Sequence, residues 1–238
     1  MYAQKDDNLF VNLFINGTAN VDLNKTSIQI TQQNNYPWNG DLLFKINPVK
    51  ATTFNLLIRI PGWSQNKVMG SDLYRFQNNI ATKAIIKING LAVEYEVANG
   101  YASLKKAWKK GDIVSVNFDM PVQKIVANEK LKDDIGKVAL QRGPIMYCAE
   151  WVDNGGKTSN IILPANTNFT TEYKSDLLNG VTVLKAQVPA VIISNNENLS
   201  TVKQAFTAIP YYSWANRGKG EMMIWFPTQI KDIELLAK

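Results

Sequence analysis

Two pairs of neighbouring carboxylates are the first residues in this chain that could do chemistry. Asp6 and Asp7 form one pair, and Asp133 and Asp134 form the other. Two carboxyl groups can act as general acid and general base only when they flank the same bond. Adjacent residues of an extended chain point to opposite faces, and both pairs lie beside turns. We therefore interpret both pairs as solvated turn residues and predict no catalytic couple.

The other residue types that carry out catalysis or bind metals are scarce. The chain has no histidine, which excludes Ser-His-Asp and Cys-His catalysis and removes the commonest zinc ligand. Its single cysteine, Cys148, lies in an apolar run and is predicted to be a buried packing residue. The oxygen-rich turns at residues 22–24 and 153–154 do not match the spacing of an EF-hand. We predict no catalytic residue, metal site or cofactor in this chain.

Tryptophan offers a different chemistry, because an aromatic face can stack on a sugar ring. The chain has 6 tryptophans. Three of them lie in predicted loops and are the candidate carbohydrate-binding residues: Trp38, Trp63 and Trp214. Packing in a core or at an interface is the commoner role of tryptophan, so it stands as the competing interpretation of each.

The charge of the chain suggests nucleic acid, but its motifs do not. The net charge is +6, and the densest basic run is residues 105–110. We interpret this run as a solvated turn between strands, because no RNA-binding aromatic motif or helical reader accompanies it. No run of about 18 apolar residues is present, so no membrane-spanning helix is predicted. The first residues lack the apolar centre of a signal peptide.

The spacing of apolar residues predicts strands throughout. In residues 52–60, Phe54, Leu56 and Ile58 share one face, as in a strand with one buried side. Residues 83–97 contain Asn89-Gly90, the pair that favours a type I′ hairpin turn. Residues 9–15 are predicted to form a strand with two apolar faces. Further strands are expected at residues 145–151, 181–188 and 205–209, with loops at residues 64–79 and 194–199.

These patterns predict an all-β protein of two consecutive antiparallel β-sandwich modules, jelly-roll or immunoglobulin-like in type. We place the first module at residues 1–124 and the second at residues 125–238. The boundary falls within residues 120–135, just before a strand, the tight turn at residues 142–144 and a second strand. No sustained period of 3.6 residues, which would indicate a helix, occurs before residue 125.

Several segments also carry a family resemblance, in the same order along nearly the whole chain. They are YAQ at 2–4, LFVNLFI at 9–15, QNNYPWNG at 33–40, LIRIPGW at 57–63, GYAS at 100–103, WKKGD at 108–112, GKVALQRGP at 136–144 and IPYYSWANRG at 209–218. With these segments the chain resembles the C-terminal part of glycoside hydrolase family 127, the β-L-arabinofuranosidase-type enzymes. None of the segments is a catalytic motif.

The resemblance implies an N-terminal (α/α)6 barrel followed by two β-sandwich modules in the parent enzyme. It also implies that the catalytic groups, a zinc-bound cysteine nucleophile with further cysteines and glutamates, lie in that barrel. Cys148 matches none of the family's zinc ligands, so the resemblance assigns no catalytic residue to this chain. Zinc is expected only in the barrel, which is absent here.

We therefore expect the non-catalytic accessory portion of a glycoside hydrolase, inactive alone, which packs on the barrel of the same polypeptide and stabilises it. Phe10 and Phe14 are the candidate docking residues, because they lie on the second apolar face of residues 9–15. The alternative is a pair of carbohydrate-binding modules that recruit plant polysaccharide. Self-association into a homo-oligomer is left open. We favour a periplasmic or secreted bacterial location over a cytoplasmic one.

Overall fold

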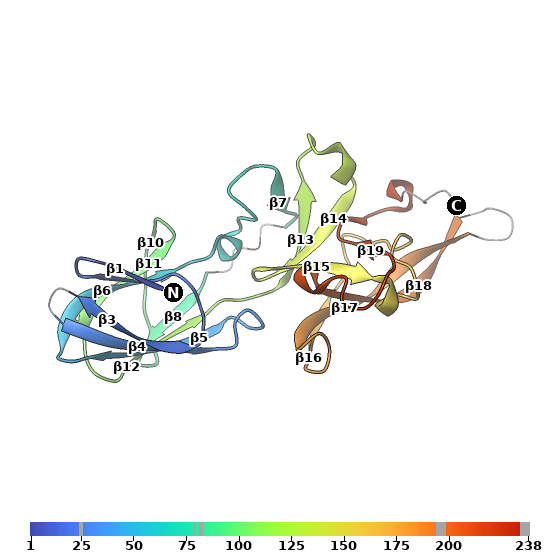
Figure 1. The fold of residues 1–238 in the computed structure, drawn as a ribbon. Coiled ribbons are helices and arrows are strands. Elements are labelled where there is room, and N and C mark those ends of the chain that lie inside the picture. The colour runs from blue at the N-terminus through green and yellow to red at the C-terminus, as the bar shows by residue number, and fades with distance from the viewer. Residues whose placement is uncertain (24–25, 79, 81–82, 194–198, 234–238) are drawn as a thin grey trace. The chain divides into compact units, whose positions relative to one another are not determined.

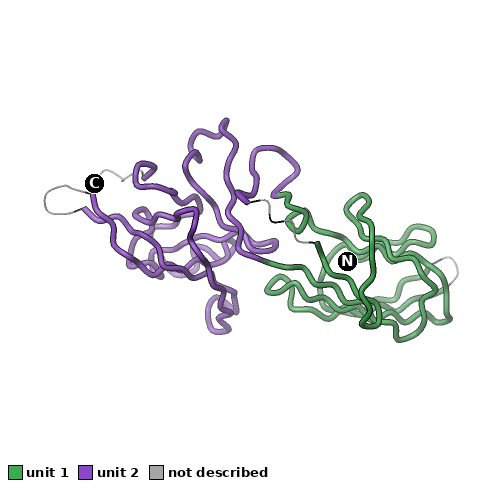
Figure 2. Tube along the Cα trace, turned by 180° about the vertical axis from the view of Figure 1, so that it is seen from behind, with its two compact units in different colours: residues 1–67, 80–120 green, residues 68–79, 121–238 purple. Residues whose placement is uncertain are grey.

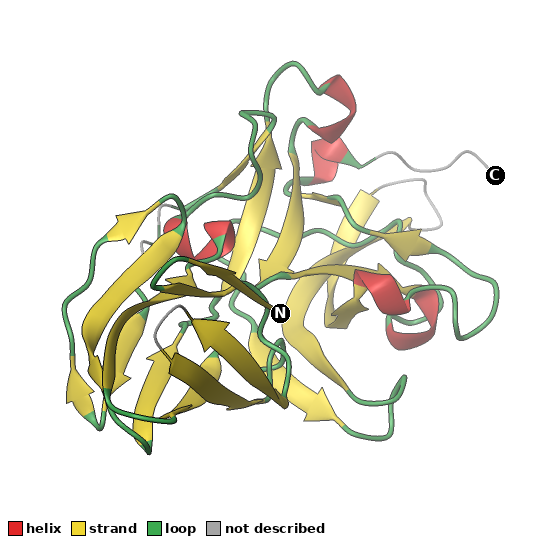
Figure 3. Cartoon of the chain, turned by 60° about the vertical axis from the view of Figure 1, so that its left-hand side comes forward, coloured by secondary structure: helices red, strands yellow, loops and turns green. Residues whose placement is uncertain are grey.

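The computed structural model describes residues 1–23, 26–78, 80, 83–193 and 199–233. The chain divides into two compact units, which Figure 2 shows in separate colours. Unit 1 comprises residues 1–67 and 80–120, and unit 2 comprises residues 68–79 and 121–238. Among the described residues there is no α-helix, and the helices in Figure 3 are short 3-10 turns. The predicted all-β fold class is thus confirmed.

Unit 1 contains two sheets (Figure 1). The five-stranded sheet has the order β1-β2-β6-β11-β10, and the six-stranded sheet has the order β3-β4-β5-β12-β8-β9. Their strands are β1 (Tyr2–Lys5), β2 (Asn8–Val11), β3 (Gly17–Leu23), β4 (Thr26–Asn34), β5 (Asp41–Pro48), β6 (Thr52–Arg59), β8 (Ile85–Ile88), β9 (Leu91–Ala92), β10 (Val97–Ala98), β11 (Tyr101–Trp108) and β12 (Asp112–Asn117).

The core of unit 1 follows from alternating apolar residues on both sheets. Phe54, Leu56 and Ile58 of β6 are at most 1% exposed, as the sequence predicts. Phe44 of β5 contributes from the other sheet and is fully buried. The buried Trp108 donates a hydrogen bond from Nε1 to the Phe54 carbonyl oxygen at 3.2 Å, which satisfies its one polar group. These faces form the interior of a β-sandwich.

The hairpin predicted at Asn89-Gly90 is confirmed. Asn89 and Gly90 both have positive φ, at 51° and 84°, which is the requirement of a type I′ turn. Two cross-strand pairs, Lys87 with Ala92 and Ile88 with Leu91, join β8 to β9. The Asn89 side chain also donates to Asp112 Oδ1 at 2.8 Å, so the turn is tied to the next strand of the sheet.

The strand predicted at residues 9–15 is wrong for its second half. β2 ends at Val11. The Asn12 N–H still donates to the Met1 carbonyl oxygen opposite it, but the Leu13 N–H shares that same acceptor, so the ladder goes no further. The alternation of faces is lost there. Phe14 turns inward and is 7% exposed, whereas Leu13 and Ile15 are 52% and 54% exposed.

Unit 2 is built on one nine-stranded sheet, whose main path is β16-β17-β18-β15-β14-β13-β7. The short strands β19 and β20 pair with β15 and β14. The strands are β7 (Tyr74–Phe76), β13 (Val122–Ala127), β14 (Lys137–Arg142), β15 (Ile145–Glu150), β16 (Thr170–Lys174), β17 (Val181–Ile193), β18 (Leu199–Pro210), β19 (Met222–Met223) and β20 (Phe226–Pro227). Short 3-10 helices are η1 (Gly62–Gln65) in unit 1, and η2 (Lys132–Asp134), η3 (Trp151–Asp153), η4 (Tyr211–Ser213) and η5 (Ile230–Asp232) in unit 2.

The loop predicted at residues 64–79 contains a strand that the sequence did not indicate. β7 pairs antiparallel with β13 through three residue pairs, among them Phe76 with Ile125. Three residues are too few to show an alternating pattern, so only the distant partner identifies the strand. Strands β17 and β18 are also longer than predicted. The loop expected at residues 194–199 falls almost wholly outside the described residues.

A buried lysine fixes an irregular segment of unit 2. Lys124 is 9% exposed, and its ammonium group donates to the carbonyl oxygens of Pro164 and Ala165 at 2.8 and 2.6 Å. The ammonium lies 5.7 Å from the centre of the Phe169 ring. Burial lowers the pKa of Lys124, and these carbonyl groups offset the cost of removing the charge from water.

Gly40 should be intolerant of any side chain. A Cβ atom at this position would lie 1.9 Å from the Phe118 carbonyl oxygen, and the Gly40 carbonyl accepts a hydrogen bond from the Phe118 N–H at 3.0 Å. Because the obstacle is backbone, we expect Gly40→Ala to lower the free energy of unfolding by about 1–3 kcal/mol, measured by urea denaturation. Gly70→Ala is the control, because nothing lies within 4 Å of its Cβ position. Equal stability of the two variants would contradict the expectation.

Candidate functional site

A buried ion cluster in unit 2 joins residues that are far apart in the sequence. Arg217 Nε donates to Glu150 Oε2 at 2.8 Å, and Arg217 Nη1 donates to Asp153 Oδ1 at 3.0 Å. Arg217 Nη2 contacts both carboxylates. The side chains of Glu150, Asp153 and Arg217 are 4%, 22% and 16% exposed. One guanidinium therefore bridges the end of β15 and η3.

The charges in this cluster are balanced by ion pairs and hydrogen bonds among its own side chains. Burial alone would lower the pKa of Arg217, but the hydrogen bonds and charges of Asp153 and Glu150 outweigh it and raise that pKa. The planar guanidinium can satisfy two carboxylates at once, which a lysine cannot. Removing one partner from such a cluster leaves a buried charge unpaired.

The cluster fixes the backbone of the loop at residues 211–217. Glu150 Oε1 accepts a hydrogen bond from the Ala215 N–H at 3.0 Å. Ala215 has a φ of 67°, which is unfavourable for a residue with a side chain and persists only when its surroundings hold it. The buried carboxylate thus holds the loop in a strained conformation.

This loop presents aromatic side chains on the surface. Tyr211, Tyr212 and Trp214 are 41%, 66% and 43% exposed. The Tyr211 and Trp214 rings are stacked, with centroids 6.1 Å apart and an interplanar angle of 11°. Exposed aromatic rings on a rigid loop suit a flat apolar partner surface. The loop at residues 211–217 is therefore the candidate functional site in unit 2.

The three tryptophans considered for sugar binding have different environments. Trp63, on η1, is buried at 8% exposure and lies 5.6 Å from the Phe118 ring. Trp38 is half-buried in a turn of unit 1. Trp214 is the only one of the three with a side chain that is largely accessible. Sugar binding by these residues stays a prediction, and the burial of Trp63 leaves it little surface for a ligand.

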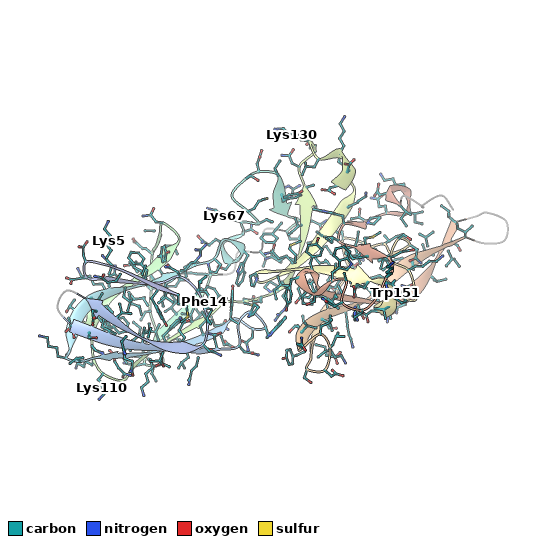
Figure 4. All side chains as sticks on the ribbon, viewed as in Figure 1. Lys5, Phe14, Lys67, Lys110, Lys130 and Trp151 are labelled. Carbon is teal, nitrogen blue, oxygen red and sulfur yellow. The ribbon has the colours of Figure 1, made fainter. Side chains whose placement is uncertain are left out.

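The two candidate docking residues also differ. Phe10 is half-buried and packs edge-on against Tyr101, with centroids 5.3 Å apart. Phe14 points into unit 1, as Figure 4 shows, and packs against Tyr36 at 5.3 Å and Phe118 at 5.6 Å. Phe14 and Trp63 thus belong to one aromatic cluster around Phe118. A docking role for Phe10 and Phe14 stays a prediction.

The remaining chemical candidates are structural. Cys148 is fully buried, as predicted, and burial together with nearby Glu150 raises its pKa to about 12. A buried thiol with a raised pKa is a poor nucleophile at neutral pH. Burial also raises the pKa of Asp134. No group of three or more His, Cys, Asp or Glu residues that could hold a metal ion occurs within the described part of the chain.

Sequence reasoning missed the ion cluster. Glu150 ends a strand, Asp153 was considered only for a weak calcium loop, and Arg217 belonged to a family motif without an assigned role. No local spacing links Arg217 to Glu150, which precedes it by 67 residues. The one signal in the sequence for this cluster was Arg217 itself, an arginine at the end of an aromatic-rich loop. None of the helices in the described part of the chain has the length and apolarity needed to cross a membrane.

Two family models match the chain. Residues 8–120 match the model of the β-L-arabinofuranosidase GH127 middle domain. Residues 122–227 match the model of the glycoside hydrolase family 127 C-terminal domain. The two matches follow one another and together span nearly the whole sequence.

The chain spans about a third of the length of the relatives described here. A non-reducing end β-L-arabinofuranosidase from Bifidobacterium longum subsp. longum is 28% identical, over 94% of this chain and 34% of its own length. The solved structure of the GH127 β-arabinofuranosidase BT3674 is 38% identical with a TM-score of 0.93, covering 98% of this chain and 37% of the other. That of a GH127 β-L-arabinofuranosidase from Geobacillus stearothermophilus T6 is 37% identical with a TM-score of 0.84, covering 95% and 34%.

Removing Arg217 should destabilise unit 2. Arg217→Met leaves the Glu150 carboxylate buried without its cation, and we expect a loss of about 3–5 kcal/mol in the free energy of unfolding. The double variant Glu150→Gln with Arg217→Met should recover part of that loss, because it removes the unpaired charge. Urea denaturation followed by circular dichroism measures both.

The control is Lys174→Met, which breaks the surface ion pair of Lys174 with Glu172. Exposed ion pairs contribute little to stability, so no measurable change is expected there. A loss in Arg217→Met no larger than in this control would show that the cluster does not hold the loop.

Proposed function

Because the chain belongs to glycoside hydrolase family 127, as its middle and C-terminal β-sandwich domains, we propose that it is the non-catalytic accessory portion of a β-L-arabinofuranosidase-like enzyme. In this proposal it packs on a catalytic barrel of the same polypeptide and stabilises it. Along the sequence, we propose residues 1–124 as the middle module and residues 125–238 as the C-terminal module.

One observation carries the proposal. The two matched models are the middle and C-terminal domains of the family, and the chain spans about a third of the length of the relatives it matches. The larger remaining part of such relatives is where the catalytic groups would lie. The resemblance described above gives that part as an (α/α)6 barrel with a zinc-bound cysteine.

The residues of this chain do not fit the zinc centre. Its one cysteine, Cys148, is fully buried with a pKa of about 12, and the adjacent carboxylates Asp133 and Asp134 lie on η2, a surface 3-10 turn. We assign no step of the reaction to this chain. Zinc chemistry and substrate binding are proposed for the barrel alone.

The docking surface proposed for unit 1 lies around residues 10–15. Leu13 and Ile15 are more than half exposed, and Phe10 is half-buried beside them in sequence. Phe14 does not lie on this surface. Its ring packs in the aromatic cluster and so holds the segment in place. Adjacent exposed apolar residues of this kind mark an interaction surface. Covering a few hundred Å2 of apolar surface would contribute several kcal/mol, at about 25 cal/mol per Å2.

The carbohydrate-binding alternative is not favoured. Both matched models describe domains of a hydrolase family, and Trp63, one of its three candidate residues, is only 8% exposed. Sugar binding would have to rest on Trp214 and the half-buried Trp38.

The chain alone should be inactive. We expect no hydrolysis of nitrophenyl arabinofuranosides above a buffer control, with zinc and reductant present, because no residue here supplies a nucleophile. The assay should use the purified chain at high concentration, with a full-length family member as positive control. Turnover that disappears when a residue of this chain is mutated would overturn the proposal.

Docking can be measured with the catalytic portion of a family relative, expressed without its two β-sandwich domains. We expect calorimetry to detect binding of this chain to that catalytic portion. The double variant Leu13→Asp with Ile15→Asp should bind at least tenfold more weakly, because burying two charges costs more than 1.4 kcal/mol. Val49→Asp is the matched control, because Val49 is an apolar residue of the same unit and is 81% exposed. Equal binding by both variants would exclude this surface, and saturable glycan binding without barrel binding would favour the alternative.

A further inference from the structure

The loop at residues 211–217 lies between β18 and β19 (Figure 1), and the chain on either side of it is fixed. Before the loop, the last residues of β18 pair with β15. After the loop, the Gly220 backbone lies directly on the Trp151 ring, since a Cβ atom at Gly220 would come within 1.9 Å of Trp151 Cδ1. The Trp151 N–H also donates to the Glu221 carbonyl oxygen at 3.0 Å. The loop therefore leaves unit 2 and returns to it at two fixed points.

Hydrogen bonds inside the loop decide which of its side chains are exposed. The Trp214 N–H donates to the Tyr211 carbonyl oxygen at 3.1 Å, and Asn216 Nδ2 donates to the Ser213 carbonyl oxygen at 3.1 Å. These bonds close a tight turn. Ser213 is buried in it at 5% exposure, whereas its neighbours Tyr212 and Trp214 are 66% and 43% exposed. The turn therefore keeps the two large rings on the surface of unit 2.

The support beneath the loop costs free energy that a surface facing only water would not need. Glu150 and Arg217 are both largely removed from water, which is unfavourable for charged groups. Glu150 accepts a hydrogen bond from the Ala215 N–H at 3.0 Å, and Ala215 keeps a φ of 67°. Backbone conformations of this kind gather at ligand clamps and other functional sites. The support therefore indicates a loop whose exact shape serves a contact.

The arrangement of the rings suits a protein partner better than a sugar. The Tyr211 and Trp214 rings are stacked at an interplanar angle of 11°, so each ring has one face against the other. A sugar ring stacks best on a broad open face. The stacked pair instead offers ring edges, together with an indole N–H and tyrosine hydroxyl groups that can donate hydrogen bonds. Tyrosine and tryptophan are the residues enriched at the centres of protein interfaces.

The size of the surface favours a partner on the same polypeptide. Three partly exposed aromatic rings offer roughly a few hundred Å2, whereas stable complexes of separate proteins bury about 800 Å2 per partner. A linked partner needs less area, because linkage raises its effective concentration. In the proposed function, the part that relatives of this chain carry in addition holds a catalytic barrel. That barrel contacts unit 1 at residues 10–15, and no contact has yet been assigned to unit 2.

We propose that the loop at residues 211–217 is the surface through which unit 2 docks on the catalytic barrel, with Tyr212 and Trp214 as its main contacts. This inference rests on the proposed function, which supplies the partner. The buried Glu150 and Arg217 act as positioning residues, because they hold the loop in its bound shape before the barrel meets it. A surface that is already ordered loses little conformational entropy on docking.

Hydroxyl-radical footprinting compares the loop with and without the barrel. In a fusion that places the catalytic portion of a family relative ahead of residue 1, Trp214 should be oxidised at least about fivefold more slowly than in the chain alone, because the barrel excludes water from the ring. Tyr173 is the internal control, since it lies in unit 2 and is 53% exposed. Protection of residues 10–15 without protection of Trp214 would refute this inference alone. Protection of neither would count against the proposed function itself.

Substitution measures what the loop contributes to binding. In calorimetry with the separate catalytic portion, Tyr212→Ser should bind at least about tenfold more weakly than the parent chain, because loss of a central aromatic side chain is among the costliest changes in an interface. Tyr173→Ser is the matched control, since it removes the same ring from an exposed position of unit 2, and should bind like the parent.

Three results of these measurements would contradict the proposal. In the first, Tyr212→Ser binds like the parent while Leu13→Asp with Ile15→Asp binds more weakly, and the proposed function then stands without this loop. In the second, the chain alone binds arabinan or another glycan saturably and Tyr212→Ser does not, which would assign the loop to sugar. In the third, sedimentation shows self-association that Tyr212→Ser abolishes, which would assign the loop to a second copy.

Discussion

Backbone pairing between strands that are distant in the sequence is the interaction on which both units depend. With no α-helix among the described residues, most buried N–H and C=O groups find their partners on another strand. β2 pairs with β6 in a parallel ladder, whereas β7 pairs with β13 antiparallel. Each such pairing has one register that keeps the apolar face inside, because a slip of one residue would turn that face to water. Long-range pairing therefore determines which side chains can form a core at all.

Where the ladder stops, buried charges replace it. Lys124 binds the carbonyl groups of an irregular segment, and Glu150 binds the N–H of Ala215 in a strained loop. In both places a charged group satisfies backbone that no strand reaches. The charge is tolerated because it is itself saturated, Lys124 by carbonyl oxygens and Glu150 by Arg217. Single substitutions at these positions are therefore expected to release a loop and to lower the stability of unit 2 as well.

The sequence predicted what is local, and missed what depends on distant partners. The alternation of Phe54, Leu56 and Ile58 and the turn at Asn89-Gly90 indicated a strand and a hairpin, and both are present. The predicted strand at residues 9–15 was too long, because its apolar pattern continues past Val11 while its pairing with β1 and β6 does not. β7 was missed because a strand of three residues is too short to show an alternating pattern. The Arg217 cluster was missed because its carboxylate partners lie 67 and 64 residues earlier in the sequence.

The distribution of exposed apolar residues bears on the proposed accessory role of this chain. In the described residues, several of them lie where a strand begins or ends: Leu13 and Ile15 beyond β2, Tyr212 and Trp214 beyond β18, and Leu199 at the start of β18. Each of these places is held by side-chain packing, by the ion cluster or by a strand ladder. Rigid apolar surfaces of this kind lose little conformational entropy when a partner covers them. Such surfaces therefore suit the proposed accessory role, in which the chain packs on another protein surface.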